Sequence, residues 1–183
     1  MMRALTLEIT TFRFAGRPQR RFVEAHAAEA VRLVRGCKSG QWPHARIVLT
    51  TMDGLQAVGL ESMARAAGVP RNGDSGPLGL ASPGTAPYAC TVVAPHGVDI
   101  LIAVEEAERV VGLGAVLLHE PVHALQISDA PAREAEIRRL RHDFGAESMS
   151  AAALRRAHRR LAADEREAQR IEHRLLKKTR GWA

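Results

Sequence analysis

The first part of the chain alternates between short apolar runs and one longer amphipathic segment. Residues 5–14 partly alternate and are rich in Thr, Ile and Phe, which favours a short strand or an arm packed on the domain. Residues 22–34 place Val and Ala at mixed three- and four-residue spacing, which predicts an amphipathic helix. Residues 46–51 contain the compact apolar run Ile47-Val48-Leu49, and its two β-branched residues predict a strand.

The middle of the chain is less regular. After the turn signal Asp53-Gly54, residues 56–60 predict another strand and residues 61–67 a short helix. Residues 69–87 contain four prolines and four glycines, which predicts a long loop. Loops of this length are often functional, so we expect it to border a binding site.

Two largely apolar runs, residues 89–94 and 98–104, flank Pro95-His96-Gly97 and predict paired strands. From Glu105 the apolar positions take helical spacing, and acidic residues stand at the start, where a helix N-terminus favours them. We therefore expect a helix from Glu105 that carries the pentapeptide beginning at His119.

The last part of the chain is helical. At Ser128-Asp129-Ala130-Pro131 we expect one helix to end and the next to begin, because Ser or Asp can cap a helix and proline is tolerated in its first turn. Helices are expected at about 132–144 and 150–178.

The element order predicts an α+β fold with a small, mainly antiparallel or mixed sheet. We expect one domain, residues 1–149, with a basic helical part, residues 150–183, packed on it.

Charge is concentrated in this last helix. The chain has a formal net charge of +6, and basic residues far outnumber acids between positions 150 and 179. The basic residues there are Arg155, Arg156, Arg159, Arg160, Arg166, Arg170, Arg174, Lys177 and Lys178. A solvated helix face and a surface for nucleic acid or an acidic partner both explain this charge. The solvated face is favoured, because no recognisable nucleic-acid-binding module accompanies it.

The two cysteines, Cys37 and Cys90, are far apart and outside any C-x-x-C spacing. They predict buried free thiols and indicate neither a disulfide framework nor a thiolate zinc site. No run of 18 uninterrupted apolar residues occurs. We therefore expect a cytoplasmic protein without a membrane partner.

The pentapeptide His119-Glu120-Pro121-Val122-His123 has the pattern H-E-x-x-H. Residues four apart lie on the same face of a helix, so His119 and His123 can offer two imidazoles to one metal ion. A zinc ion with three protein ligands keeps a water in its fourth position and lowers the pKa of that water. Glu120 would be the general base that takes the proton.

The surrounding sequence carries a family resemblance. Residues 117–126, LLHEPVHALQ, resemble the H-E-x-V-H-x-x-Q helix of small bacterial metallopeptidases of the zincin class. A β run before an apolar helix that presents the motif also resembles the arrangement by which zincins lay substrate along an edge strand beside the metal. The resemblance implies a minimal zincin-like domain, a Zn²⁺ cofactor and hydrolysis of peptide bonds.

A third ligand must come from elsewhere in the chain. Gluzincins take a Glu from a later helix, and Glu165-Arg166-Glu167-Ala168 resembles their E-x-E-A segment, which favours Glu165. The metzincin pattern would instead use Asp129. However, Gln126 stands where that class has the glycine that permits a sharp turn, which counts against Asp129. Glu167 is the remaining candidate.

Pro121 lies inside the motif. An internal proline removes one helical hydrogen bond and clashes with the preceding turn, at a cost of about 3 kcal/mol. A kinked helix would keep the two imidazoles together. The alternative is that residues 110–118 form a strand and Pro121 begins a new helix, which would separate His119 from His123.

These observations predict a zinc metallopeptidase that acts on a peptide or protein substrate, with His119, His123 and Glu165 as ligands and Glu120 as the catalytic residue. The alternative is a catalytically inactive, zincin-like basic module of plasmid or phage origin. Such a module would use its Arg-rich helix to bind nucleic acid or a partner protein.

Overall fold

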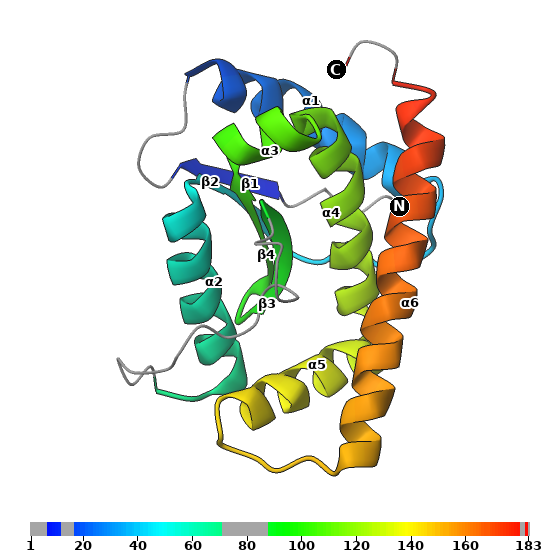
Figure 1. Cartoon of the computed structure of the whole chain (residues 1–183). Helices are drawn as coiled ribbons and strands as arrows, with labels where there is room; N and C mark the ends of the chain where they lie inside the picture. The colour runs from blue at the N-terminus through cyan, green and yellow to red at the C-terminus, as the bar shows by residue number, and fades with distance from the viewer. Residues whose placement is uncertain (1–6, 12–16, 71–87, 180–181, 183) are drawn as a thin grey trace.

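A computed structural model describes residues 7–11, 17–70, 88–179 and 182 of the chain. A four-stranded mixed sheet lies at its centre in the order β1-β2-β4-β3 (Figure 1). Strands β1 (Leu7–Thr11), β2 (Ala45–Thr50) and β4 (Gly97–Ala103) run parallel, and β3 (Ala89–Ala94) pairs antiparallel with β4. The mixed sheet is therefore confirmed, whereas a mainly antiparallel one is wrong, because only the β3–β4 pair is antiparallel.

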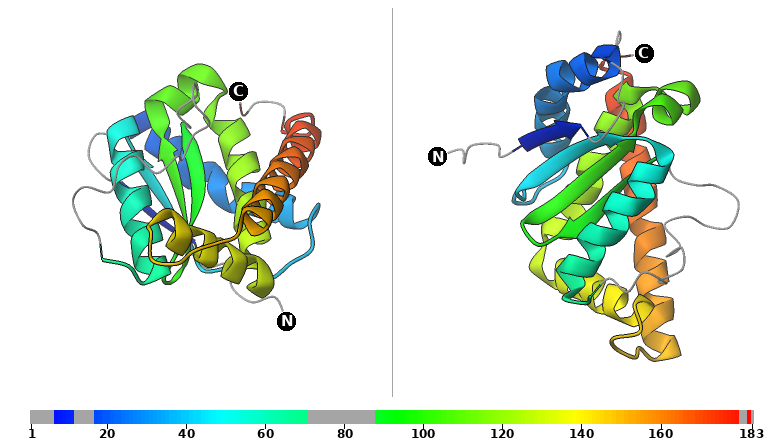
Figure 2. Two further views of the ribbon diagram at one scale, coloured as in Figure 1. Left: turned by 60° about the horizontal axis from the view of Figure 1, so that its bottom comes forward. Right: turned by 90° about the vertical axis from the view of Figure 1, so that its left-hand side faces the viewer.

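Helices cover both faces of the sheet (Figures 1 and 2). Alternate residues of β4 point to opposite layers: Ile100 packs in the core shared with α1 and α4, and Leu101 in the core shared with α2. Because both faces are buried, most residues of β2 and β4 are apolar. The helices are α1 (Arg17–Arg35), α2 (Met52–Ala67), α3 (Val104–Val110), α4 (Leu113–Ser128), α5 (Ala130–Asp143) and α6 (Ala151–Leu176).

Helix α4 is the central helix of the molecule. It packs on the sheet, on α1 and along α6, so that twelve of its sixteen residues are buried. This burial offsets the cost of Pro121, and the helix continues through the proline from Leu113 to Ser128. The alternative in which Pro121 begins a new helix is therefore wrong.

Two expectations for the local structure are wrong. Residues 56–60 lie within α2, because the Thr51 side chain caps this helix by accepting a hydrogen bond from the Gly54 amide, and Gly68 ends it with a φ of 69°. The single helix expected from Glu105 is two helices, because Gly112 adopts a φ of 84° between α3 and α4. Only glycine takes such a conformation at little cost.

Other expected elements are present with small shifts in their ends. The helix expected at 22–34 lies within α1, and the helices expected at 132–144 and 150–178 correspond to α5 and α6. The expected 69–87 loop falls almost entirely outside the described residues. In the part of the chain that the structure describes, no single helix meets the length and apolarity of a membrane span, although the bent pair of α3 and α4 together does.

Candidate metal centre

The two histidines of the motif converge on one point. His119 and His123 lie one turn apart on α4, and their Nε2 atoms are 3.0 Å from each other. The side chains are 17% and 21% exposed, so the pair lies just below the surface. Two imidazole nitrogens this close need a proton or a metal cation between them, because two lone pairs would otherwise face each other.

Helix α6 supplies a carboxylate to the same point. Oε2 of Glu165 lies 3.2 Å from Nε2 of His123 and 3.6 Å from Nε2 of His119. Tetrahedral ligands about 2.0–2.2 Å from a zinc ion are about 3.3–3.6 Å apart, so the three observed separations are close to what zinc requires. Within the described residues, this is the one group of at least three His, Cys, Asp or Glu side chains that could hold a metal ion.

The other nitrogen of each imidazole has a hydrogen-bond partner. Nδ1 of His119 lies 2.8 Å from a carboxylate oxygen of Glu172, and Nδ1 of His123 lies 2.7 Å from Oε1 of Gln126. A carboxylate can only accept, so Nδ1 of His119 carries the proton. Its Nε2 is then free to coordinate a metal, as in the carboxylate–histidine–zinc arrangement of metal sites.

The orientation of Gln126 fixes the second imidazole in the same way. Its Nε2 donates to the backbone oxygen of Asp164 at 2.9 Å and to the Glu167 carboxylate at 2.9 Å. Both partners only accept, so Oε1 must be the atom that faces His123 and accepts the proton of Nδ1. Lys38 holds Glu167 through an ion pair of 2.7 Å. A chain of contacts from Lys38 therefore keeps the Nε2 lone pair of His123 directed at the point where the side chains of His119 and Glu165 also meet.

The electrostatics of the three side chains favour a cation at their meeting point. Burial lowers the pKa of His119, but the carboxylates of Glu165 and Glu172 outweigh this effect and raise the pKa to about 10. The pKa of His123 is also raised in spite of its burial, chiefly by Glu165. The two imidazoles in turn lower the pKa of the Glu165 carboxyl. A positive charge, either a proton or a metal ion, is therefore stabilised there.

The other two candidates for the third ligand are occupied elsewhere. Glu167 contacts Lys38 and Gln126, and so supports the site from behind. The side chain of Asp129 accepts a hydrogen bond from the Ala132 amide and caps α5. The fold thus brings Glu165 to the histidines and does not bring Glu167 or Asp129.

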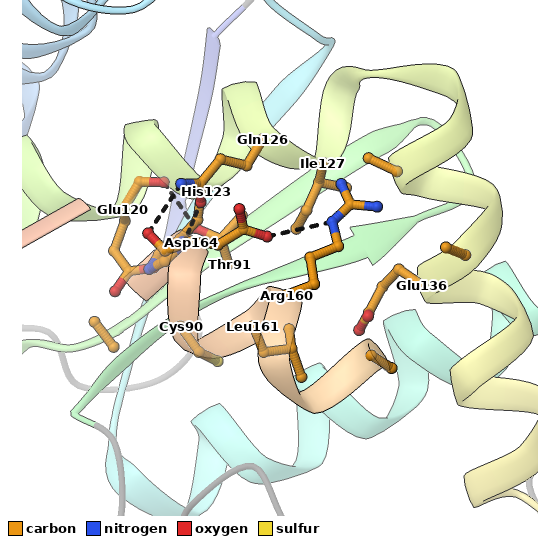
Figure 3. A pocket seen from close by; sticks show the side chains of 14 residues that line it. Cys90, Thr91, Glu120, His123, Gln126, Ile127, Glu136, Arg160, Leu161 and Asp164 are labelled. Atoms are coloured by element: carbon orange, nitrogen blue, oxygen red, sulfur yellow. Dashed lines mark hydrogen bonds and ion pairs between the residues drawn. The ribbon is translucent and has the colours of Figure 1, made fainter. Parts of the chain in front are cut away.

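Glu120 lies on the side of α4 that faces β3. Its side chain is buried, and Oε2 accepts a hydrogen bond of 2.8 Å from the hydroxyl of Thr91. Glu120 and His123 line a cavity of about 270 Å³ between β3, α4, α5 and α6 (Figure 3). The remaining wall of this cavity is largely aliphatic, including Ile127 and Leu161, with Arg160 at one side.

Several residues of the site carry no signal in the sequence. Glu172 lies two helical turns beyond Glu165 on α6, and this spacing could have suggested a second carboxylate on the same face. Nothing in the sequence indicates Thr91 or Lys38, because their roles depend on how the elements pack. Cys37 and Cys90 are free and half-buried, and burial raises the pKa of the Cys90 thiol. Neither belongs to the metal-binding group.

Comparisons of the chain with protein-family models, with curated proteins and with solved structures found no match.

Proposed function

We propose that the chain is a zinc-dependent metallopeptidase with His119, His123 and Glu165 as ligands and Glu120 as general base. The observation that carries the proposal is the convergence of two imidazoles and one carboxylate at separations of 3.0–3.6 Å. Both imidazoles are oriented by acceptors on Nδ1, which is an arrangement that a metal site needs and a core histidine pair does not.

The donor set fits zinc better than calcium or magnesium. Zinc takes imidazole nitrogen and carboxylate oxygen as ligands, whereas calcium and magnesium favour oxygen alone. Zinc held by three protein ligands supplies a Lewis acid and lowers the pKa of water at its open position. Glu165 is 47% exposed and His123 lines the cavity, so the open position would be reached from solvent and from the cavity.

Glu120 would move the proton. The Thr91 hydroxyl holds its Oε2, which leaves Oε1 to accept a proton from water and to deliver it to the leaving amine of the substrate. Burial keeps the carboxylate away from competing solvent. Glu120 lines the same cavity as His123, which supports a general base that acts beside this candidate ligand (Figure 3).

A substrate peptide would lie along β3. This strand is at the edge of the sheet, and Ala89, Cys90 and Thr91 line the cavity that also contains Glu120. An edge strand has backbone groups free on its outer side, which an extended peptide can pair with as an additional strand. The aliphatic wall of the cavity would then receive an apolar side chain of the substrate.

The test combines metal content with peptide hydrolysis. Protein purified without chelators should contain about one zinc per chain, and it should hydrolyse a mixed peptide library read by mass spectrometry. Glu120→Gln should keep the zinc and lose activity by at least about 100-fold, because a general base contributes about 10²–10⁴-fold. Glu134→Gln, an exposed carboxylate on α5, is the matched control and should leave activity unchanged. Protein without metal that is indifferent to chelators would contradict the proposal.

A further inference from the structure

The outer face of α6 carries a straight line of basic side chains. With about 100° per residue, Arg155, Arg159, Arg166, Arg170, His173 and Lys177 fall within a sector of about 60° on this helix axis. We call these six residues the basic stripe. The stripe is about 33 Å long, because it spans 22 residue steps of about 1.5 Å each.

The basic stripe faces solvent. All six residues are exposed, and the buried residues of the helix, Ala168, Ile171 and Leu175, lie on the opposite side. The four acidic residues of α6, which include Glu165 and Glu172 of the metal centre, all fall outside the sector of the stripe. One helix therefore has a metal-binding side and a separate basic side.

The charges of the basic stripe have no partners among the described residues. None of the described acids lies within 4.0 Å of these charges as an ion-pair partner, whereas the neighbouring Arg160 is paired with Asp164 at 3.5 Å. Arg20, Arg32 and Arg65, which lie on other helices, each have an acidic partner on the same helix. Four arginines and Lys177 thus form a row of five full positive charges, and His173 lies between them in the row.

The geometry points to a nucleic-acid backbone as the ligand of the basic stripe. Nucleic acid presents a continuous line of negative charge, about one per 1.7 Å of duplex axis, and one duplex turn is about 34 Å long. A straight row about 33 Å long has the length of about one duplex turn, so it crosses the phosphate backbones of a duplex more than once. Four of its residues are arginines, whose guanidinium groups bind phosphate oxygens in a bidentate manner.

An acidic protein surface fits these features less well. Protein interfaces combine an apolar core with a polar rim, but between Arg155 and Lys177 the sector of the stripe contains only basic residues, and Ala162 and Ala163 lie about 20° beyond its two edges. Contacts of phosphate with a plain basic face would position the chain on nucleic acid without reading its sequence. This binding goes beyond the proposed peptidase activity and does not depend on zinc.

The test is fluorescence anisotropy with the full-length protein and labelled 20-mers of arbitrary sequence, as duplex DNA, duplex RNA and single-stranded DNA. Duplex binding should weaken with salt, with a slope of log K against log[salt] of about −4.5 for five phosphate contacts. The double variant Arg166→Glu/Arg170→Glu should weaken binding at least about tenfold and reduce the slope by about 2. The three probes distinguish which form of the phosphate backbone is preferred.

The matched control is Arg21→Glu/Arg109→Glu, which makes the same change in net charge at exposed positions of α1 and α3. Stripe-specific loss of binding supports the inference, and thermal melts of both variants exclude unfolding as its cause. Equal loss in both variants would overturn it, because net charge alone would then explain the binding. Tighter binding to a labelled poly-glutamate peptide than to the 20-mers would also overturn it, in favour of an acidic protein partner.

Discussion

Gln126 is the residue that determines how His123 is presented. It accepts the proton of Nδ1 and donates to Asp164 and Glu167, so it can take only one orientation. Gln126→Leu would keep the size of the side chain and remove all three hydrogen bonds. We expect zinc affinity to fall by about 10–100-fold, as is typical when the partner of a metal-binding histidine is removed.

Competition with a coloured zinc chelator measures this affinity. Gln56→Leu, at an exposed position of α2 away from the site, is the matched control and should bind zinc as the unchanged protein does. An affinity that is unaltered by Gln126→Leu would show that the imidazole is held by packing alone.

Asp99 is a buried carboxylate on the opposite face of the sheet from the metal centre. Burial raises its pKa, but hydrogen bonds from Arg46 and Ser62, together with the charge of Arg46 and the nearby His96, outweigh this and lower it. A folded-state pKa below the ordinary value of 3.8 stabilises the fold above that pH. This contribution is lost as the pH falls through the lowered folded-state pKa.

Asp99→Asn should therefore destabilise the protein at neutral pH by about 2 kcal/mol, the usual worth of hydrogen bonds to a charged group. The difference between the two proteins should shrink below about pH 4, where the carboxyl of the unfolded chain becomes protonated. Urea unfolding at pH 7 and pH 3 measures both values. If the difference in unfolding free energy between the two proteins were the same at pH 7 and pH 3, it would contradict a lowered pKa of Asp99 in the folded state.

At the scale of elements, Gly97 determines the tight connection between β3 and β4. It has a φ of 148°, and a Cβ added there would lie 2.0 Å from the backbone oxygen of His44. Gly97→Ala should thus combine backbone strain with a clash and destabilise the fold by about 2–4 kcal/mol.

Gly68→Ala separates these two effects. Gly68 has a φ of 69°, but its Cβ would meet nothing within 4 Å, so only the strain of about 1–2 kcal/mol is expected. Thermal or urea unfolding of both variants measures the difference. If both variants lost the same free energy of unfolding, the chain beside His44 would have to move to accept the methyl group at position 97.

The sequence predicts most elements of the fold, because apolar runs and helical spacing follow directly from burial. The runs 89–94 and 98–104 became strands because both faces of the sheet are covered. The break at Gly112 was not predicted, since a glycine within a helical pattern carries no unique meaning. Residues 56–60 were misassigned because the Asp53-Gly54 turn signal concealed the helix cap at Thr51.

The candidate site was predictable in part for a related reason. His119, Glu120 and His123 are local in sequence, so helical spacing alone places them together. Glu165 depended on a resemblance, and Glu172, Thr91 and Lys38 depend on how α6, β3 and the end of α1 pack against α4. Contacts between distant segments are a property of tertiary packing, which spacing along the chain does not encode.

At the scale of the whole molecule, the candidate metal centre is made by two helices that are far apart in the chain. His119 and His123 come from α4, and Glu165 comes from α6, which packs along the outer side of α4 (Figure 1). A zinc ion bound by all three would hold α6 against the central helix of the fold. Zinc binding should therefore be visible as global stability, whether or not any substrate is known.

Zinc at about 1,000 times its dissociation constant should add about 4 kcal/mol to the free energy of unfolding. For a chain of this size that corresponds to a rise in Tm of about 8–16 °C, which differential scanning fluorimetry with zinc and with EDTA measures. Glu165→Gln should abolish most of this rise, because it removes the ligand from α6. Glu167→Gln, two residues along α6 and about 200° around its axis from Glu165, is the matched comparison. It should retain most of the rise, since Glu167 acts only through Gln126. If Glu167→Gln removed the rise and Glu165→Gln did not, the third ligand would be Glu167, and α6 would have to rotate about its axis to bring it to the histidines.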